Sequence, residues 1–197
     1  MSSTVVEMKC PGCGARVNVG QQECMYCHKP IVISTLNSLD QIGLSELNKY
    51  VTSYNEVLKN NPNEASIAAS LGLCFFKLGR YDQAIDSLQK AQAYDMENSE
   101  LFFHEAIAVL KGKKAFLVPR DIINRALECL DAAIMLEPKG IYYYYTAYLK
   151  YDYFFRKHLN TSPNYLEVLA TAQSVGVSEY DITQLYEMLK VPRPNEL

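Results

Sequence analysis

The chain has 197 residues, of which 49% are hydrophobic and 21% are charged, and its formal net charge is −3. This composition is sufficient for one medium-sized core with a small appendage, whereas the slightly negative charge argues against binding nucleic acid or a membrane surface through bulk electrostatics. No apolar run approaches the roughly 20 residues that a membrane-spanning helix needs. The N-terminus lacks a basic stretch followed by an apolar one, so we expect no secretory signal and a cytoplasmic location.

Residues 1–33 differ in composition from the rest and form the first predicted domain. Short runs of β-type residues lie at 4–6, 16–19 and 31–33. Four of the six cysteines fall within residues 10–27, and in a reducing compartment such clustering favours metal ligation over disulfides. The other two, Cys74 and Cys129, lie in helical patterns and are interpreted as small buried hydrophobic residues.

The clustered cysteines form two Cys-x-x-Cys pairs, Cys10 with Cys13 and Cys24 with Cys27. Structural zinc is bound by four such ligands in a tetrahedron, and Gly12 and Gly14 let the first turn curl so that backbone amides point at sulfur. The motif resembles the zinc-ribbon family over about residues 8–33. This resemblance implies one structural Zn²⁺ ion held by all four thiolates, with no open position for catalysis.

Three other chemistries fit parts of the cysteine pattern. The run Cys24-Met-Tyr-Cys27-His28 matches the attachment motif for c-type haem, but that use would require export and would leave the first pair idle. A thioredoxin-like redox pair is disfavoured because no βαβ context surrounds it. Iron in a rubredoxin-type site uses the same four thiolates, so the ligands alone do not distinguish zinc from iron. His28 is interpreted as a neighbour of the site, not a ligand.

After a polar linker at 34–43, the apolar spacing becomes helical over the second predicted domain, 44–191. Eight helices are predicted, approximately at 45–59, 63–78, 81–94, 99–111, 119–136, 141–157, 162–176 and 178–190. Asn63 is the predicted N-cap of the second helix. Ser178 has an acidic residue three positions on and predicts a capping box for the eighth. Residues 192–197 contain two prolines and are predicted to be a frayed tail.

The third and fifth predicted helices contain an internal repeat. The equivalent positions are Ala84, Leu88, Ala91 and Met96, and Ala126, Leu130, Ala133 and Pro138. With Gly72, Gly79 and Tyr81, this pattern over 70–95 resembles the tetratricopeptide repeat family, and a second repeat over 99–138 carries about eight extra residues between its helices. The resemblance implies a mainly α fold in which stacked helical hairpins present a surface to a protein or peptide partner.

Two segments contain candidate partner-binding residues. The run 141–155 has aromatic residues on all sides of its predicted helix, which indicates either a central helix packed on both sides or a recognition surface formed by Tyr142, Tyr145 and Tyr153. The insert at 111–120 combines basic and apolar residues. As a partner loop it would present Lys113, Lys114 and Phe116, and as a long turn it would pack its apolar residues back onto the helices.

These features predict a non-enzymatic adaptor that binds a protein or peptide partner through its helical surface. The alternative is a nucleic-acid-associated accessory protein that contacts RNA or DNA through the ribbon, although residues 1–33 carry only three basic residues against two acidic ones. A redox or zinc-sensing switch is a third hypothesis. His28, His104 and His158 lie in separate segments, and no nucleophile triad or phosphate loop is present, which argues against an enzyme with a small-molecule substrate.

Overall fold

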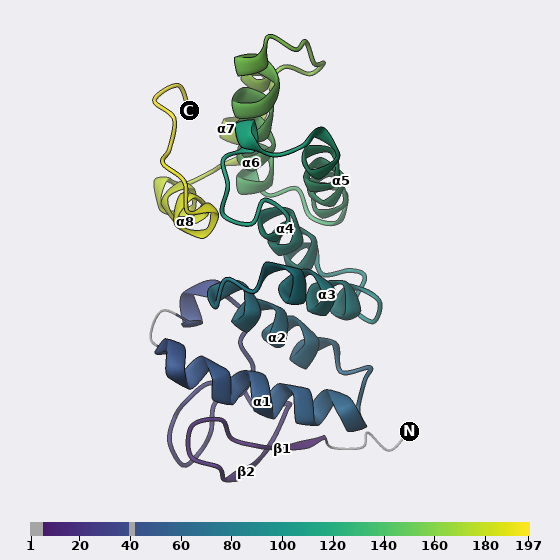
Figure 1. The fold of residues 1–197 in the computed structure, drawn as a ribbon, viewed down its shortest axis with the longest axis vertical. Helices are drawn as coiled ribbons and strands as arrows, with labels where there is room; N and C mark the ends of the chain where they lie inside the picture. Colours follow the sequence, from purple (N-terminus) through teal and green to yellow (C-terminus); the bar gives the residue numbers. More distant parts are fainter. Residues whose placement is uncertain (1–5, 40–41) are drawn as a thin grey trace. The chain divides into compact units, whose positions relative to one another are not determined.

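The computed structural model describes residues 6–39 and 42–197. These residues form eight α-helices and a two-stranded antiparallel sheet, which belong to two compact units, Met1–Met96 and Glu97–Leu197 (Figure 1). The prediction of a mainly α fold with a small N-terminal β element is confirmed. Among the described helices, none has the length and apolar character needed to cross a membrane.

The sheet pairs β1 (Glu7–Lys9) with β2 (Arg16–Asn18), and Met8 lies opposite Val17 on the buried side. β2 lies within the predicted run at 16–19. The first strand is formed by the residues that follow the predicted run at 4–6, of which residues 4 and 5 lie outside the described part of the chain.

The Ile31 amide bonds to the Gln22 carbonyl at 2.8 Å, but helix side chains bind the Ile31 carbonyl and both backbone groups of Ile33, so the predicted strand at 31–33 is wrong. The Tyr54 hydroxyl donates to the carbonyl oxygen of Ile31 at 2.8 Å. The Oγ atom of Ser70 lies 3.0 Å from both the amide nitrogen and the carbonyl oxygen of Ile33. Both isoleucines are fully buried, so the apolar residues that suggested a strand instead form part of the core.

The first unit contains the turn η1 (Leu36–Leu39) and the helices α1 (Leu44–Asn60), α2 (Ala65–Lys77) and α3 (Tyr81–Gln92). Helices α2 and α3 form a hairpin that turns at Gly79, whose φ is +73° (Figure 1). They approach closely because Gly72 has no side chain: a Cβ there would lie 2.9 Å from Cγ of Leu88. Both residues are repeat positions, so the tetratricopeptide-like hairpin is confirmed at the site of the strongest sequence match.

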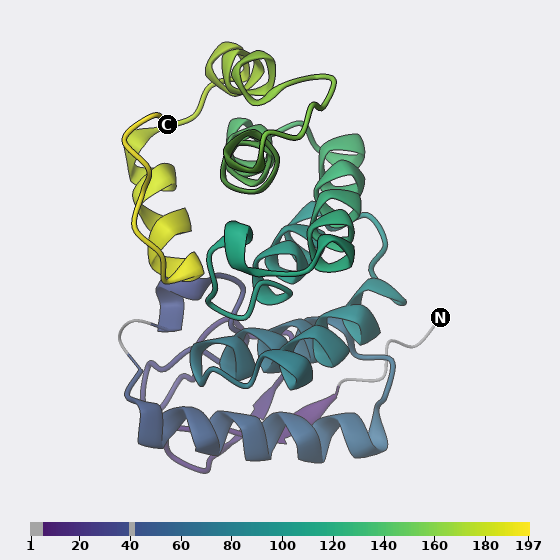
Figure 2. The ribbon, with the colours of Figure 1, turned by 45° about the horizontal axis from the view of Figure 1, so that its top comes forward.

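The second unit contains α4 (Ser99–Ala108), α5 (Arg120–Leu136), α6 (Gly140–Leu149), α7 (Tyr165–Val175) and α8 (Glu179–Leu189). α4 packs on α5, α6 packs on α7, and α8 contacts both α4 and α6 (Figure 2). The predicted sixth helix at 141–157 is helical throughout, but its type changes along its length. α6 continues as a π-helical turn, η3 (Lys150–Phe154), and then as a 3₁₀ turn, η4 (Phe155–Lys157).

The helix ends show where local capping rules were sufficient. The capping box of Ser178 and Asp181 at α8 is confirmed, and Asn98 caps α4 by accepting a bond from the Glu100 amide. The predicted cap at Asn63 is wrong, because α2 begins after Glu64 with no side-chain cap bond. A capping box at Asn164 begins α7 and was not predicted.

Candidate metal centre and partner surfaces

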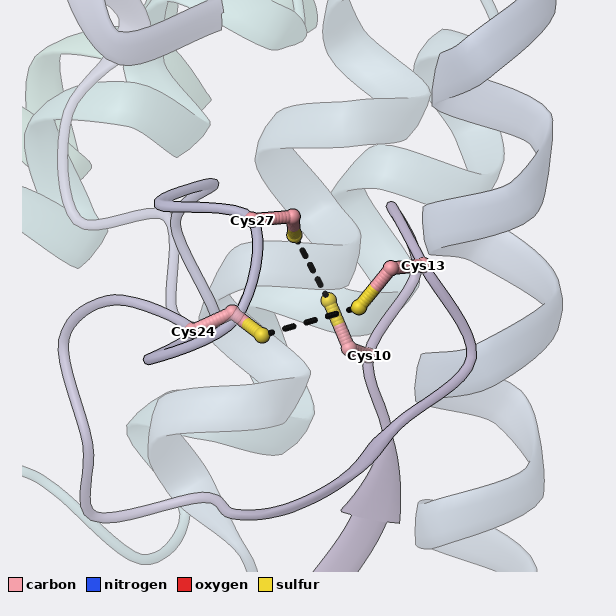
Figure 3. Close-up of side chains that lie close together, drawn as sticks. All are labelled: Cys10, Cys13, Cys24 and Cys27. Atoms are coloured by element: carbon pink, nitrogen blue, oxygen red, sulfur yellow. Dashed lines mark hydrogen bonds between the residues drawn. The ribbon is translucent and has the colours of Figure 1, made fainter.

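The four N-terminal cysteines converge on one point (Figure 3). The Sγ atoms of Cys10 and Cys27 are 3.6 Å apart, those of Cys13 and Cys24 are 3.7 Å apart, and all four lie within 4.8 Å of one another. Zinc–sulfur bonds of about 2.3 Å in a tetrahedron place the sulfurs about 3.8 Å apart, whereas disulfide sulfurs are about 2.05 Å apart. The four cysteines are free thiols that fit a tetrahedral shell and could hold a metal ion.

The two Cys-x-x-Cys turns share one backbone geometry. The Gly14 amide donates to the Cys10 carbonyl at 2.8 Å in the first turn, and the His28 amide donates to the Cys24 carbonyl at 2.8 Å in the second. Gly14 and His28 have φ values of +78° and +57°. His28 therefore occupies a left-handed position that glycine fills in the first turn and that few other residues adopt. Its side chain is exposed.

Gly12 permits the two turns to approach each other. A Cβ at this position would lie 2.7 Å from Cδ of Lys29 and 3.2 Å from Sγ of Cys27. Because Cys27 is one of the four converging residues, a side chain at position 12 would press directly on a sulfur atom of the site. Gly12 was expected to let its own turn curl. The structure shows that it also leaves space for Cys27 and Lys29 of the second turn.

The thiols differ in acidity because their surroundings differ. Burial raises the pKa of Cys10 to about 12. Burial also acts to raise the pKa of Cys24, but hydrogen bonds from the backbone amides of Tyr26 and Cys27 outweigh it and lower that pKa to about 6. Cys24 thus favours the thiolate, whereas the pKa of Cys27 in the same turn is raised and the Cys10 thiol needs a nearby cation to ionise. A metal ion among the four sulfurs would supply that charge, and its binding would release protons.

The segment that follows the second turn joins the ribbon to α1 and α2. Lys29 forms an ion pair with Glu46 on α1, and the Tyr50 hydroxyl donates to the Pro30 carbonyl at 3.1 Å. Tyr54 on α1 and Ser70 on α2 bond in the same way to Ile31 and Ile33, the residues that follow Pro30. The ribbon therefore belongs to the first compact unit. These contacts were not predicted from the sequence. Tyr50 and Tyr54, four positions apart on α1, were a signal, because a buried hydroxyl needs a hydrogen-bond partner.

The aromatic residues of α6 and η3 lie in the core of the second unit. Tyr142 and Tyr145 are fully buried and Tyr153 is 6% exposed. The Tyr142 hydroxyl lies 3.0 Å from Oγ of Ser99, and the Tyr145 hydroxyl donates to the Ala106 carbonyl at 2.9 Å. Of these three predicted partner-binding side chains, two therefore have no exposed surface and Tyr153 has very little. Of the two interpretations of the aromatic run, the central helix describes what is observed.

The insert at 111–120 contains a short 3₁₀ turn, η2 (Ala115–Leu117), and lies partly against η3. Lys113 and Lys114 are exposed. Phe116 is half-buried, with the Arg156 guanidinium 4.7 Å from its ring centre, and its amide donates to Asp152 at 2.8 Å. The two lysines are thus accessible to a partner, whereas Phe116 already makes contacts within its own unit.

A cavity of about 440 Å³ opens between α1, α2 and α3 in the first unit. Its walls include apolar residues from α1 and α2, among them Leu58, Leu71 and Phe75. Lys59 on α1 and Lys90 on α3 also line it, and both are exposed. An apolar floor with a few polar groups is typical of binding pockets.

No family model matches the sequence, and no curated protein sequence matches it significantly. Among solved structures, the chain is similar to MamA (residues 41 to the end) from Desulfovibrio magneticus RS-1, with a TM-score of 0.46 and 19% sequence identity. That match covers 78% of this chain and 75% of the other. A likeness at this level concerns the arrangement of helices and assigns no function.

Proposed function

We propose that the chain is a non-enzymatic scaffold that holds a protein partner on its helical surface, and that its N-terminal cysteines bind one structural zinc ion. The metal assignment is supported by four sulfur atoms whose separations agree with a tetrahedral shell. Four thiolates complete that shell, so the ion would stabilise the fold and leave no site for a reacting water.

The observation that carries the partner-binding part is the cavity between α1, α2 and α3. Its apolar floor can receive a bulky side chain, and its lysines and amide side chains can fix the orientation of a bound segment. Zinc would support this surface through α1, which lines the cavity and also bonds to the ribbon through Glu46, Tyr50 and Tyr54. Structural zinc contributes about 10–16 kcal/mol in small metal-dependent folds.

The metal assignment is tested by elemental analysis of the purified full chain. We expect one zinc per chain, lost in the variant that combines Cys10→Ser with Cys13→Ser. Iron in the same shell would absorb visible light and would contradict the choice of metal, and a chain without any tetrahedrally bound metal would contradict the site itself.

The partner surface is tested by photo-crosslinking in cells with a benzophenone amino acid at position 90 or 49. Lys90 lines the cavity, whereas Lys49 is an exposed residue of α1 that does not. We expect a discrete protein adduct from position 90 and none from position 49. Equal labelling from both positions, or none from either, would contradict binding at this cavity.

A further inference from the structure

Positive charge gathers on one surface of the second unit. The insert at 111–120 lies partly against η3, and its Phe116 ring lies near two basic side chains of η4. Residues 111–121 and 152–158 contain six basic residues and two acidic ones, in a chain whose net charge is −3. The basic surface consists of Lys113, Lys114, Arg120, Arg156 and Lys157. Its charge is therefore opposite in sign to that of the chain as a whole.

Aromatic rings hold two of these cations in place. The Arg156 guanidinium lies 4.7 Å and the Lys157 ammonium 5.0 Å from the ring centre of Phe116. The same ammonium lies 3.7 Å from the ring centre of Tyr153. A cation is attracted to the face of an aromatic ring, so these contacts restrict long side chains that would otherwise be free. Charges that are already oriented bind a partner at a lower cost in conformational entropy.

Most of the charge on the basic surface is not neutralised within the chain. Asp152 pairs with Arg156 and raises its pKa, with a smaller contribution from Glu196. No ion pair with another described residue is formed by Lys113, Lys114, Arg120 or Lys157. Lys157 is half-buried and the other three are exposed. Three oriented or exposed cations beside the insert are thus open to an anionic partner.

The rings beneath the cations are not open to nucleic-acid bases. Tyr153 and Phe154 are each 6% exposed, and Lys157 lies over the first ring and Arg120, at 5.9 Å, over the second. Proteins that bind single strands without sequence preference need aromatic faces on which bases can stack. The arrangement therefore favours a partner that supplies carboxylates and no stacking groups.

The apolar part of this surface is small. Leu117, in the same turn as the lysines, is 70% exposed. Peripheral membrane proteins that bind through an apolar surface insert the whole face of an amphipathic helix, which a single leucine does not provide. One exposed leucine beside several cations is instead suited to a short segment that has one apolar side chain among acidic ones.

We propose that the basic surface binds an acidic segment of a partner protein, in which acidic residues lie on both sides of an apolar one. The carboxylates face Lys113, Lys114 and Arg120, and the apolar side chain contacts Leu117. Arginine can bind a carboxylate through two parallel N–H donors, whereas lysine acts as a point charge. This surface shares no residue with the cavity between α1, α2 and α3, so it adds a second contact to the proposed scaffold.

The probe is a fluorescein-labelled peptide of four Glu-Glu-Leu repeats, and its binding to the full chain is followed by fluorescence anisotropy. At about 0.01 M salt, where the screening length is about 30 Å, we expect saturable binding that weakens as salt is added. At about 0.1 M salt, Lys114→Gln and Arg120→Gln should each weaken binding about two- to fivefold, the contribution of one exposed ion pair. Lys49→Gln is the matched control, because Lys49 is exposed but is not part of the basic surface, and should leave binding unchanged.

A second peptide, with serine in place of each leucine, tests the apolar contact. Leu117→Ala should weaken binding of the leucine peptide about threefold, because apolar surface is no longer removed from water. The same substitution should leave binding of the serine peptide unchanged. Equal losses for both peptides would contradict a contact between Leu117 and the apolar residue of the segment.

The proposal is overturned if the leucine peptide shows no saturable binding up to about 1 mM at low salt. Equal losses in the Lys114, Arg120 and Lys49 variants would also overturn it. Polyuridylate and vesicles containing phosphatidylserine are titrated in the same salt, and tighter binding of either would replace the protein segment by nucleic acid or lipid. Crosslinking from position 90 reports only on the cavity of the first unit, so each of the two proposals can fail while the other stands.

Discussion

Ser70 on α2 bonds to both backbone groups of Ile33, a residue 37 positions earlier in the chain. Its Oγ accepts the Ile33 amide, and its single proton is shared between the carbonyls of Ile33 and Ser66, at 3.0 and 2.8 Å. The side chain is fully buried. One hydroxyl thus joins the end of the four-cysteine ribbon to the middle of α2, so the two share a core.

We expect Ser70→Ala to destabilise the first unit by about 1–3 kcal/mol, because the Ile33 amide would remain buried without a partner. Urea denaturation of the metal-loaded chain measures the change. Ser66→Ala on the same helix is the control, since its side chain is exposed, and should stay within about 0.5 kcal/mol of the parent. Equal effects of the two substitutions would show that the Ser70–Ile33 contact does not join the ribbon to α2.

We expect Gly12→Ala to weaken metal binding by roughly tenfold, the lower range for changes in the surroundings of a metal site. The added Cβ would lie 3.2 Å from the Cys27 sulfur, and the turn must shift to relieve the contact. Competition with a chromophoric chelator measures the affinity. Gly20→Ala in the same ribbon adds a Cβ no closer than 3.4 Å to its neighbours. A loss of affinity in that control equal to the loss at position 12 would argue against the steric explanation.

The convergence of the cysteines could be predicted because its causes are local. Two thiols three positions apart in a tight turn must point to the same side, and only a second such turn can complete a shell of soft ligands. The helices were predicted nearly as well, because a period of 3.6 residues in the apolar pattern reflects a buried face. The repeat spacing around Gly72 and Leu88 succeeded for a similar reason, since close helix contact requires a small residue.

The features that could not be predicted depend on partners distant in the sequence. Ile31 and Ile33 have the alternation of a strand, but the Ile31 carbonyl bonds to Tyr54 and both backbone groups of Ile33 bond to Ser70. The π-helical turn after Leu149 is equally non-local, because it buries Asp152 where the Phe116 amide of another segment can reach it. The pocket between residues 192–196 and the segment 148–156 depends on the same kind of distant contact, which two prolines in the sequence do not indicate.

Two tyrosines of α6 should respond in opposite ways to loss of the hydroxyl. Tyr145→Phe should destabilise the second unit by about 1 kcal/mol, because the Ala106 carbonyl loses a buried donor. Tyr148→Phe should be neutral or stabilising, because its hydroxyl makes no hydrogen bond of ordinary geometry to the described residues, although Asp152 and the Ala115 backbone lie near enough to influence its pKa. Each substitution keeps the aromatic ring, so the two variants differ only in the hydroxyl that is lost and not in packing. Thermal unfolding followed by circular dichroism compares them, and a larger loss at Tyr148 would reveal a bond that the structure does not contain.

A buried histidine should make stability depend on pH. His104 on α4 is 7% exposed, and burial lowers its pKa from the ordinary value of 6.5, although Glu100 acts in the opposite direction. Between pH 6.5 and the lowered pKa of folded His104, the unfolded chain therefore binds a proton that the folded chain does not, so the free energy of unfolding decreases as the pH falls through this range. Between pH 7.5 and 5.5 this loss should approach about 1.4 kcal/mol when the folded pKa lies well below that range.

The measurement is the free energy of unfolding at several pH values for the metal-loaded parent and for His104→Gln, which keeps a neutral polar side chain. Protons also compete with the metal for thiolates, but that contribution is common to both proteins and cancels in the difference. The variant should lose less stability than the parent on acidification. His158→Asn is the control, because His158 is exposed and its left-handed backbone suits asparagine. Parallel pH profiles for the parent and His104→Gln would mean that His104 is protonated as readily in the folded chain as in the unfolded one.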